Sequence, residues 1–255
     1  MHSPQHIRTD QIPGLMSITL AQPEKKNALD DAMYRALTTA FARADADPTV
    51  RVVLLTAEGD DFCAGNDIAE FLAMSRSGDL PEPSAALGFL HALAAFGKPI
   101  VSAVRGHALG IGMTMLLHCD LVYVAEDARL SAPFVDLALT PEAASSLLLP
   151  ARVGHARAFA MFVLGESLDG RAAVECGLAN AALPGDRVAA CAHAAALTLA
   201  SKPAQAVQST RRLMREQGRL RAVIDSEARV FRERLLSAEA QAVLQAFATR
   251  RRPGA

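Results

Sequence analysis

The sequence predicts an α/β fold, and three observations support this class. Strand-like and helix-like segments alternate up to about residue 184, as expected for parallel strands joined by helical crossovers. The run Val50–Thr56 is nearly continuous in apolar character, which is typical of a strand covered on both faces. With 255 residues, 51% of them hydrophobic, the chain can form one large domain or a main domain with a helical appendage.

The first hundred residues supply strands and helices by their periodicity. Leu15–Leu20 alternates with period two, which predicts a strand. Met33, Leu37 and Phe41 recur at helical spacing and predict an amphipathic helix over residues 30–45. The same patterns predict helices at Ile68–Met74 and Ala85–Phe96 and a buried strand at Ile100–Val104.

The stretch Arg105–Asp120 joins that strand to a buried helix through three glycines. Gly106, Gly110 and Gly112 permit a tight turn, and Met113–Leu117 is apolar on every side. Free backbone N–H groups at a buried helix start suit a developing negative charge. The same glycines are equally compatible with close helix–strand packing and nothing more.

In the second half of the chain, Thr140, Pro141 and Glu142 predict a helix start. Threonine is a favourable N-cap, proline suits the first helical position, and an acid favours the first turn. Strands are expected at Asp120–Ala125 and Leu178–Leu183, an extended piece at Arg129–Ala132, and helices at Gly154–Leu164 and Asp169–Cys176. From Val188 onward the chain is expected to be helical, with interruptions at Lys202-Pro203 and Gly218.

Charge and cysteine content exclude several classes of protein. The formal net charge is −1, from 26 basic and 27 acidic side chains, so neither nucleic acid nor an anionic membrane is an expected partner. No apolar run reaches the roughly 18 residues of a membrane span, and the first ten residues lack a signal-peptide core. The four cysteines form no C-x-x-C pair, which indicates reduced thiols, no metal site and a cytoplasmic location.

Four motifs together carry a family resemblance. They are E-K-K-N-A-L, F-C-A-G-N-D-I, R-G-H-A-L-G-I-G-M and T-P-E-A-A-S-S, in this order. With them, the chain resembles the crotonase (enoyl-CoA hydratase/isomerase) superfamily from about Leu15 to Arg212. The resemblance implies an α/β crotonase-like spiral of ββα units with a C-terminal α-helical trimerisation region. Residues 1–190 would form the core with the thioester site, and residues 191–255 a helical region for oligomerisation and part of the CoA site.

The resemblance also assigns candidate site residues. Two backbone N–H groups, those of Asn66 and Ile111, would hold the enolate oxygen of an acyl-CoA thioester, and Glu142 would be the proton carrier. The CoA-binding candidates are Lys25, Lys26, Ala28, Ala64, Asp67, Ile68 and Gly110. No separate cofactor is implied, because coenzyme A is part of the substrate, and the expected assembly is a homotrimer or a dimer of trimers. Arg211, Arg212 and Arg215 either face the CoA phosphates or form a solvated basic helix face.

The acid–base residues separate the possible reactions. A hydratase of this family carries two glutamates, at positions that here hold Thr114 and Phe134. The segment around Glu142 instead looks like that of the Δ3,Δ2-enoyl-CoA isomerases, in which one carboxylate moves the proton during fatty acid or related acyl-CoA catabolism. Burial should raise the pKa of Glu142 and a helix N-terminus should lower it. We expect burial to dominate, because a group that takes and returns a proton works best with a pKa near the working pH.

Two other interpretations stay open at this point. Asp136 or Thr114 beside the thioester would favour another crotonase-type reaction, such as residual hydration, or thioester hydrolysis or cleavage by a lyase. A Glu142 that points to solvent would favour a CoA-binding protein without catalysis. Without the resemblance, Glu142 would be an ordinary first-turn helix acid.

Overall fold

A six-stranded sheet forms the centre of the computed structural model, which describes residues 6–78 and 83–250. The strand order is β1-β2-β3-β4-β6-β8. β1 pairs antiparallel with β2, and every other pair is parallel. The strands are β1 (Ile7–Ile12), β2 (Gly14–Leu20), β3 (Val50–Ala57), β4 (Ile100–Val104), β6 (Leu121–Ala125) and β8 (Ala181–Leu183). A second, parallel pair joins β5 (His107–Leu109) to β7 (Arg129–Ser131).

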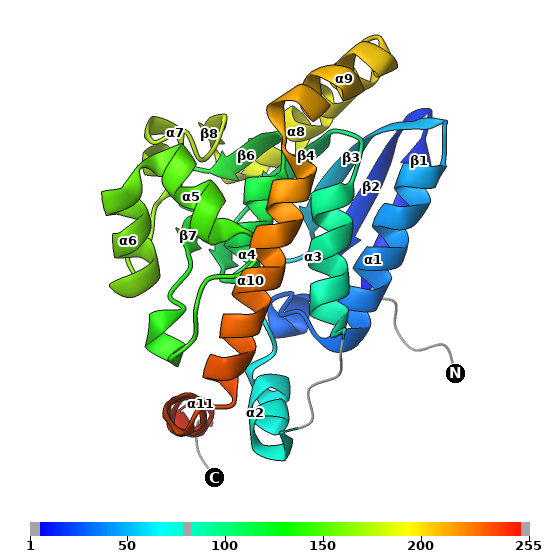
Figure 1. Ribbon diagram of the computed structural model, residues 1–255. Coiled ribbons are helices and arrows are strands. Elements are labelled where there is room, and N and C mark those ends of the chain that lie inside the picture. Colours follow the sequence, from blue (N-terminus) through cyan, green and yellow to red (C-terminus); the bar gives the residue numbers. More distant parts are fainter. Residues whose placement is uncertain (1–5, 79–82, 251–255) are drawn as a thin grey trace.

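Helices cover both faces of the six-stranded sheet. α1 (Asp31–Ala46), α3 (Ala85–Ala95) and α10 (Gln217–Leu235) lie side by side on the near face (Figure 1). α8 (Gly185–Ala200) lies behind the sheet, against β2, β3, β4 and β6. This double cover explains why β4 is buried at every position. The expected α/β class is confirmed.

Shorter elements complete the fold. The other helices are α2 (Ile68–Ser77), α4 (Ile111–Thr114), α5 (Ser145–Val153), α6 (His155–Val163), α7 (Gly170–Glu175), α9 (Ala204–Met214) and α11 (Ala238–Arg250), with 3-10 turns η1 (Pro23–Lys25), η2 (Met115–His118) and η3 (Val135–Leu137). α9 projects from the body of the molecule, whereas α11 returns to α2 (Figure 1). Within the described residues, no helix has the length and apolarity needed to cross a bilayer. α8 spans the boundary predicted between residues 190 and 191, and that division stays a prediction.

The edge strand β1 is missing from the sequence-based prediction. Of its six residues only Ile7 is buried, and the others are polar or exposed. An edge strand with one solvated face and four successive polar residues gives no alternating signal. The signal-peptide prediction rests on the first ten residues, and residues 1–5 of these lie outside the part of the chain that the structure describes.

The helix start predicted at Thr140 is wrong. α5 begins at Ser145, because Ala143 and Ala144 adopt left-handed backbone conformations with φ of 61° and 55°. Such conformations cost a non-glycine residue about 1–2 kcal/mol each and cannot continue a right-handed helix. Thr140 caps nothing: its Oγ1 is buried without a hydrogen-bond partner in the described part of the chain.

The predicted interruption at Gly218 is also displaced. Gly218 lies in the first turn of α10, and the break between α9 and α10 falls at residues 215–216. Arg215 is extended there, with φ −133° and ψ 116°, and its side chain is bound to His118. A tertiary contact therefore ends α9, and no helix-breaking residue is needed.

Candidate active site

A cavity of about 670 Å³ lies between the N-terminal part of α1, α2, α3 and α10. Apolar side chains form most of its wall, among them Leu29, Phe71, Leu87, Leu90, Ile224 and Phe231. Polar residues also line it, and among them Tyr34 and Glu142 are buried and Asn66 is half-buried. The cavity thus combines an apolar wall with a few buried polar groups, as small-molecule sites usually do.

Glu142 is a buried carboxylic acid at this cavity. It is 9% exposed, and Thr114 Oγ1 donates a hydrogen bond to its Oε1 over 2.5 Å. Desolvation raises the pKa of Glu142 to about 8, the nearby Glu227 carboxylate adds to the rise, and the Thr114 hydrogen bond opposes it. The expected rise through burial is confirmed. The expected opposition from a helix N-terminus is wrong, because Glu142 precedes α5 and its carbonyl oxygen only accepts from Ser145 N in a turn.

The Asn66 amide N–H points away from Leu29, the residue with which Asn66 forms an isolated bridge. Leu29 N donates to Gly65 O over 2.8 Å, and Asp67 N donates to Leu29 O over 2.9 Å, so Leu29 and Asn66 form a parallel bridge. In a parallel bridge, the residue between the two bonded groups directs its own N–H to the opposite side. The Asn66 side chain is held separately, because the Tyr34 hydroxyl donates to Asn66 Oδ1.

The Ile111 amide begins the short helix α4. Gly110 N donates to Ser131 O over 2.9 Å, and Gly110 O accepts from Met113 N and Thr114 N. These bonds leave the first N–H group of α4, that of Ile111, without a helical acceptor. The two predicted oxyanion donors are therefore backbone N–H groups that the local backbone hydrogen bonds described above leave unpaired.

Glycines bring the two amide-bearing segments together. A Cβ atom at Gly112 would lie 2.6 Å from Cys63 O, and one at Gly65 would lie 3.3 Å from Leu109 O. A Cβ at Gly110 would lie 4.0 Å from Gly65 Cα. The glycines are needed for the close packing of these two segments. That packing places the segments of Asn66 and Ile111 side by side, so the two interpretations of the glycines are compatible.

The predicted CoA-binding residues lie on neighbouring segments. Lys25 Nζ is 3.1 Å from Asp67 Oδ2, and Lys26 Nζ is 3.2 Å from Asp61 Oδ2. Ala64 N donates to Lys26 O over 2.9 Å, which ties the two loops together. Asp67 also caps α2, of which Ile68 is the first residue, whereas Gly110 precedes α4 and Ala28 N donates to Lys25 O. These ion pairs are exposed on the lysine side, so both ammonium groups are accessible.

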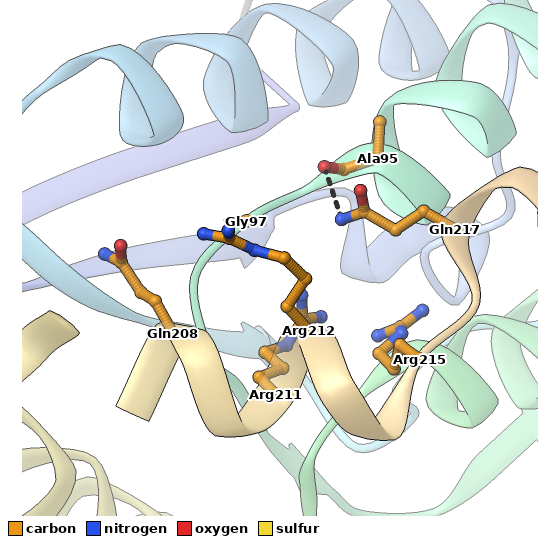
Figure 2. A pocket seen from close by; sticks show the side chains of 7 residues that line it. All are labelled: Ala95, Gly97, Gln208, Arg211, Arg212, Arg215 and Gln217. Atoms are coloured by element: carbon orange, nitrogen blue, oxygen red, sulfur yellow. Dashed lines mark hydrogen bonds between the residues drawn. The ribbon is translucent and has the colours of Figure 1, made fainter. Parts of the chain in front are cut away.

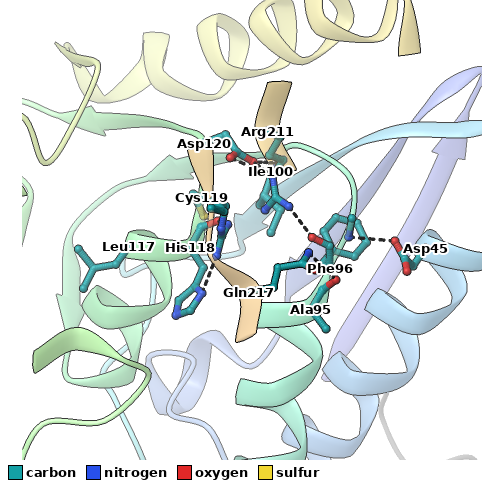
Figure 3. Close-up of polar contacts among 12 residues, drawn as sticks. Asp45, Ala95, Phe96, Ile100, Leu117, His118, Cys119, Asp120, Arg211 and Gln217 are labelled. Atoms are coloured by element: carbon teal, nitrogen blue, oxygen red, sulfur yellow. Dashed lines mark hydrogen bonds and ion pairs between the residues drawn. The ribbon is translucent and has the colours of Figure 1, made fainter. Parts of the chain in front are cut away.

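The arginines at the end of α9 and just after it do not line this cavity. Arg211 is buried: its Nε lies 2.8 Å from Asp120 Oδ2, and its Nη1 donates to Phe96 O (Figure 3). Arg215 donates to His118 O over 2.7 Å. Arg212 is exposed and lines a separate pocket of about 200 Å³ beside Gly97 (Figure 2). A solvated face is therefore wrong for Arg211, and both Arg211 and Arg215 are bound to the protein itself.

Two residues of the site were missed by the sequence-based interpretation. Tyr34 shares the buried face of α1 with Met33 and Leu37. A hydroxyl group among apolar side chains was the sequence signal that could have indicated a buried polar site. Glu227 lies in a stripe of buried residues on α10, between Ile224 and Leu235. An acid on an apolar helix stripe is a sequence signal for a specific buried partner.

The positions that could carry a second acid do not. Thr114 contacts Glu142, as described above, and Phe134 is buried against Phe162 with ring centroids 5.9 Å apart. Asp136 is exposed on η3 and is absent from the cavity lining found among residues 6–78 and 83–250. Cys63 is buried, and desolvation raises the pKa of its thiol to about 12, which disfavours a thiolate nucleophile.

Comparison with known proteins identifies the family. The sequence profile described as enoyl-CoA hydratase/isomerase matches residues 11–254. Enoyl-CoA delta isomerase 2 of Rattus norvegicus is 32% identical over 243 residues, which are 93% of this chain and 62% of the rat protein. The chain thus spans less than two thirds of that relative. The 2,3-dehydroadipyl-CoA hydratase of Escherichia coli (strain K12) is 29% identical over 241 residues, 94% of each chain.

The fold leads to the same family. The solved structure of OdaA from Pseudomonas aeruginosa is 44% identical to this chain, with a TM-score of 0.90, and the match covers 95% of this chain and 98% of that one. At this identity and coverage, sequence and fold agree along almost the whole chain. The chain therefore belongs to the enoyl-CoA hydratase/isomerase family of the crotonase superfamily.

Proposed function

We propose that the protein is an acyl-CoA isomerase that moves a double bond from C3 to C2 of an enoyl-CoA thioester. The observation that carries the proposal is that Glu142, which lines the cavity, is hydrogen-bonded to Thr114. Within the described residues that line it, Glu142 is the buried carboxylate, whereas Asp31 and Glu70 are half-buried and Asp225 is exposed. A threonine at the position of a hydratase glutamate leaves one acid, and isomerisation needs only one.

The proposed reaction balances with a single proton carrier. The Glu142 carboxylate removes a proton from C2, and the electron pair of that C–H bond shifts toward the thioester oxygen to give a dienolate. Glu142, now a carboxylic acid, returns the proton to C4. The C3–C4 double bond is then replaced by a C2–C3 double bond, and no water is added. A raised pKa suits this role, because the group must act as base and acid in turn.

The Asn66 and Ile111 amides are proposed to hold the dienolate oxygen. Both N–H groups are unused by the neighbouring backbone, and the glycines described above keep their segments in contact. Removal of one such donor typically costs about 3–4 kcal/mol of transition-state stabilisation. Lys25 and Lys26, with the backbone of Ala28, Ala64, Asp67, Ile68 and Gly110, are proposed to bind the CoA part of the substrate, and no further cofactor enters the proposal.

The alternatives have less support from the side chains. Hydration needs a carboxylate-bound water between two acids, and Thr114 and Phe134 cannot supply the second acid. Thr114 does lie next to Glu142, so a lyase or hydrolase reaction that uses its hydroxyl is the second candidate. A CoA-binding protein without catalysis is disfavoured, because Glu142 is buried at the cavity and does not point to solvent.

A paired assay tests the proposal. Wild type and Glu142→Gln are compared on a 3-enoyl-CoA and on a 2-enoyl-CoA, with CoA binding measured by calorimetry. We expect wild type to isomerise the first and barely hydrate the second, and Glu142→Gln to lose about 10²- to 10⁴-fold in kcat while binding is kept. The proposal fails if Glu142→Gln is as active as wild type, or if hydration is the faster reaction.

We further propose that the chain assembles as a homotrimer or a dimer of trimers. Leu213 and Met214 are 89% and 80% exposed at the end of α9, the helix that projects from the body (Figure 1). Large exposed apolar side chains on a projecting helix are typical of a subunit interface. Light scattering is expected to give a trimer or hexamer mass, and Leu213→Glu with Met214→Glu is expected to reduce it. A monomeric wild type would refute this assembly.

A further inference from the structure

The turn that carries Glu142 is held by a residue far away in the sequence. Glu227, on α10, accepts hydrogen bonds from Ala144 N over 2.6 Å and from Ser146 N over 2.9 Å. Its Oε1 also accepts from Ser146 Oγ over 2.5 Å. Glu227 is 9% exposed, so these contacts are made away from solvent.

These contacts replace the missing cap of α5. The N-cap position of α5 is Ala144, whose methyl side chain cannot accept a hydrogen bond from the first-turn amides. The Glu227 carboxylate accepts from these amides instead, across 81 or more residues of sequence. Burial raises the pKa of the Glu227 carboxyl, and the hydrogen bonds from Ser146 and Ala144 oppose this rise. Because all three neighbours donate, the ionised form of Glu227 matches the site.

The other side of the turn is held in a similar way. His118 Nδ1 lies 2.9 Å from Arg215 Nη2, and His118 Nε2 lies 2.7 Å from Ala143 O. Arginine is only a donor, so Nδ1 accepts and Nε2 carries the proton that it donates to Ala143 O. Burial and the nearby arginines lower the pKa of His118 to about 3, which keeps this neutral tautomer. The two left-handed alanines are therefore bound from both sides, by η2 through His118 and by α10 through Glu227.

We propose that Glu227 is the positioning residue of Glu142: it holds the Ala143–Ala144 turn so that Glu142 reaches the cavity, and it keeps a second negative charge beside that carboxylate. The inference deepens the proposed function and rests on it for the role of Glu142. It also gives α10 a part in the chemistry, in addition to the wall residues that this helix contributes to the cavity.

The charge of Glu227 acts on Glu142 together with other groups. The titratable groups that interact with Glu142 are Tyr34 on α1, Cys63 in the loop after β3, and Glu227 on α10. Tyr34 and Cys63 are neutral at ordinary pH, because burial raises both of their pKa values. Glu70, Asp225, Arg229 and Arg232 line the wider cavity. Glu227 is thus the nearby charge that raises the pKa of Glu142.

Three variants separate position from charge. Glu227→Gln removes the charge and leaves one acceptor oxygen, whereas the three donors of Ala144 and Ser146 use both oxygens of the carboxylate. Glu227→Asp keeps the charge but shortens the side chain, and Ser146→Ala removes only the hydroxyl contact. The matched control is Glu216→Gln, which removes a carboxylate that is 76% exposed at the start of the same helix.

Two readouts are compared in folded protein. The first is kcat and KM on a 3-enoyl-CoA across pH. The second is an infrared titration of the Glu142 carboxyl band, assigned by its loss in Glu142→Gln. For Glu227→Gln we expect kcat to fall about 10- to 100-fold with KM nearly unchanged, because a shift of about 1 Å in a catalytic group has this effect. The Glu142 titration should move to lower pH, because a like charge has been removed.

The other variants make the result specific. Glu227→Asp should lose kcat but keep the raised titration, Ser146→Ala should show a smaller fall in kcat, and Glu216→Gln should resemble wild type in both. Wild-type kcat and titration in Glu227→Gln would overturn the inference, as would the same shifts in Glu216→Gln. If wild type has no isomerase activity, the proposed function fails, but the infrared titration still decides whether Glu227 acts on Glu142.

Discussion

Thr114 Oγ1 lies 2.5 Å from Glu142 Oε1, at a cavity whose other walls are mainly apolar. The hydroxyl belongs to α4, the same short helix that begins with the Ile111 amide. One helix of four residues therefore contributes an oxyanion candidate and the partner of the proposed proton carrier.

Replacement of Thr114 should change the pH dependence of the reaction. The Thr114 hydrogen bond stabilises the ionised Glu142 and lowers its pKa, so Thr114→Val should raise that pKa above about 8. Less base is then present at neutral pH, and kcat/KM at pH 7 should fall about tenfold, as expected for one hydrogen bond to a charged group.

The measurement is a pH profile of kcat/KM, whose rising limb should move to higher pH in Thr114→Val. Thr114→Ser, which restores the hydroxyl, serves as the control and should follow wild type. An unchanged limb in Thr114→Val would contradict the contact as the structure shows it.

The buried Glu142 should reduce stability as pH rises. Its pKa in the folded protein is about 8, above the ordinary value of 4.5. The folded state therefore holds this proton more tightly, and the associated stability is full below about pH 4.5 and lost as pH rises to about 8. Glu142→Gln, which stays neutral, should escape this loss.

Thermal unfolding of wild type and Glu142→Gln across pH 4 to 9 checks this sign. The two melting temperatures should be similar near pH 4 and should diverge up to about pH 8, with the variant more stable. A difference that is constant with pH, or one that favours wild type at pH 9, would show that Glu142 is not a buried acid.

Gly112 should not tolerate a side chain. A Cβ there would lie 2.6 Å from Cys63 O, so Gly112→Ala must push the Cys63 segment away from α4 and separate the two amides. We expect a loss of kcat/KM of about 100-fold, since small displacements in a site have large effects.

The control for this substitution is Gly88→Ala in α3, where no atom lies within 4 Å of the new Cβ. A helix-interior glycine replaced by alanine should add about 0.5–1 kcal/mol of stability without loss of activity. The measurements are kcat/KM and the melting temperature of both variants. A fully active Gly112→Ala would contradict the close packing of α4 against the Cys63 segment.

The arginines of α9 should differ sharply in their effect on stability. Arg211 is 6% exposed and bound to Asp120, so Arg211→Leu removes the ion-pair partner of that carboxylate and should cost about 3 kcal/mol. Arg212 is exposed, and Arg212→Leu should change stability by less than about 0.5 kcal/mol. Urea unfolding measures both values, and equal losses would contradict the contrast in burial.

Local patterns were sufficient for most of the fold. The alternation in Leu15–Leu20, the helical spacing of Met33, Leu37 and Phe41, and the apolar run Ile100–Val104 each appear as the predicted element. The polar edge strand β1 was not predicted, because its stability comes from pairing with β2 and not from its own composition. The position of the break before α10 was not predicted for a related reason, since the extended Arg215 contacts His118, which is distant in sequence.

The sequence by itself determined the fold class and the glycine-dependent segments, because turns, periodicity and residue type act over a few neighbours. Its resemblance to the crotonase superfamily made Glu142 a candidate. Only the tertiary structure decided where α5 begins, which carboxylate caps it and what Glu142 contacts. Thr114, Tyr34 and Glu227 come from three separate helices, 28 to 108 residues from Glu142 in sequence. Burial and hydrogen bonding at that range depend on how the helices pack, so no local pattern carries that information.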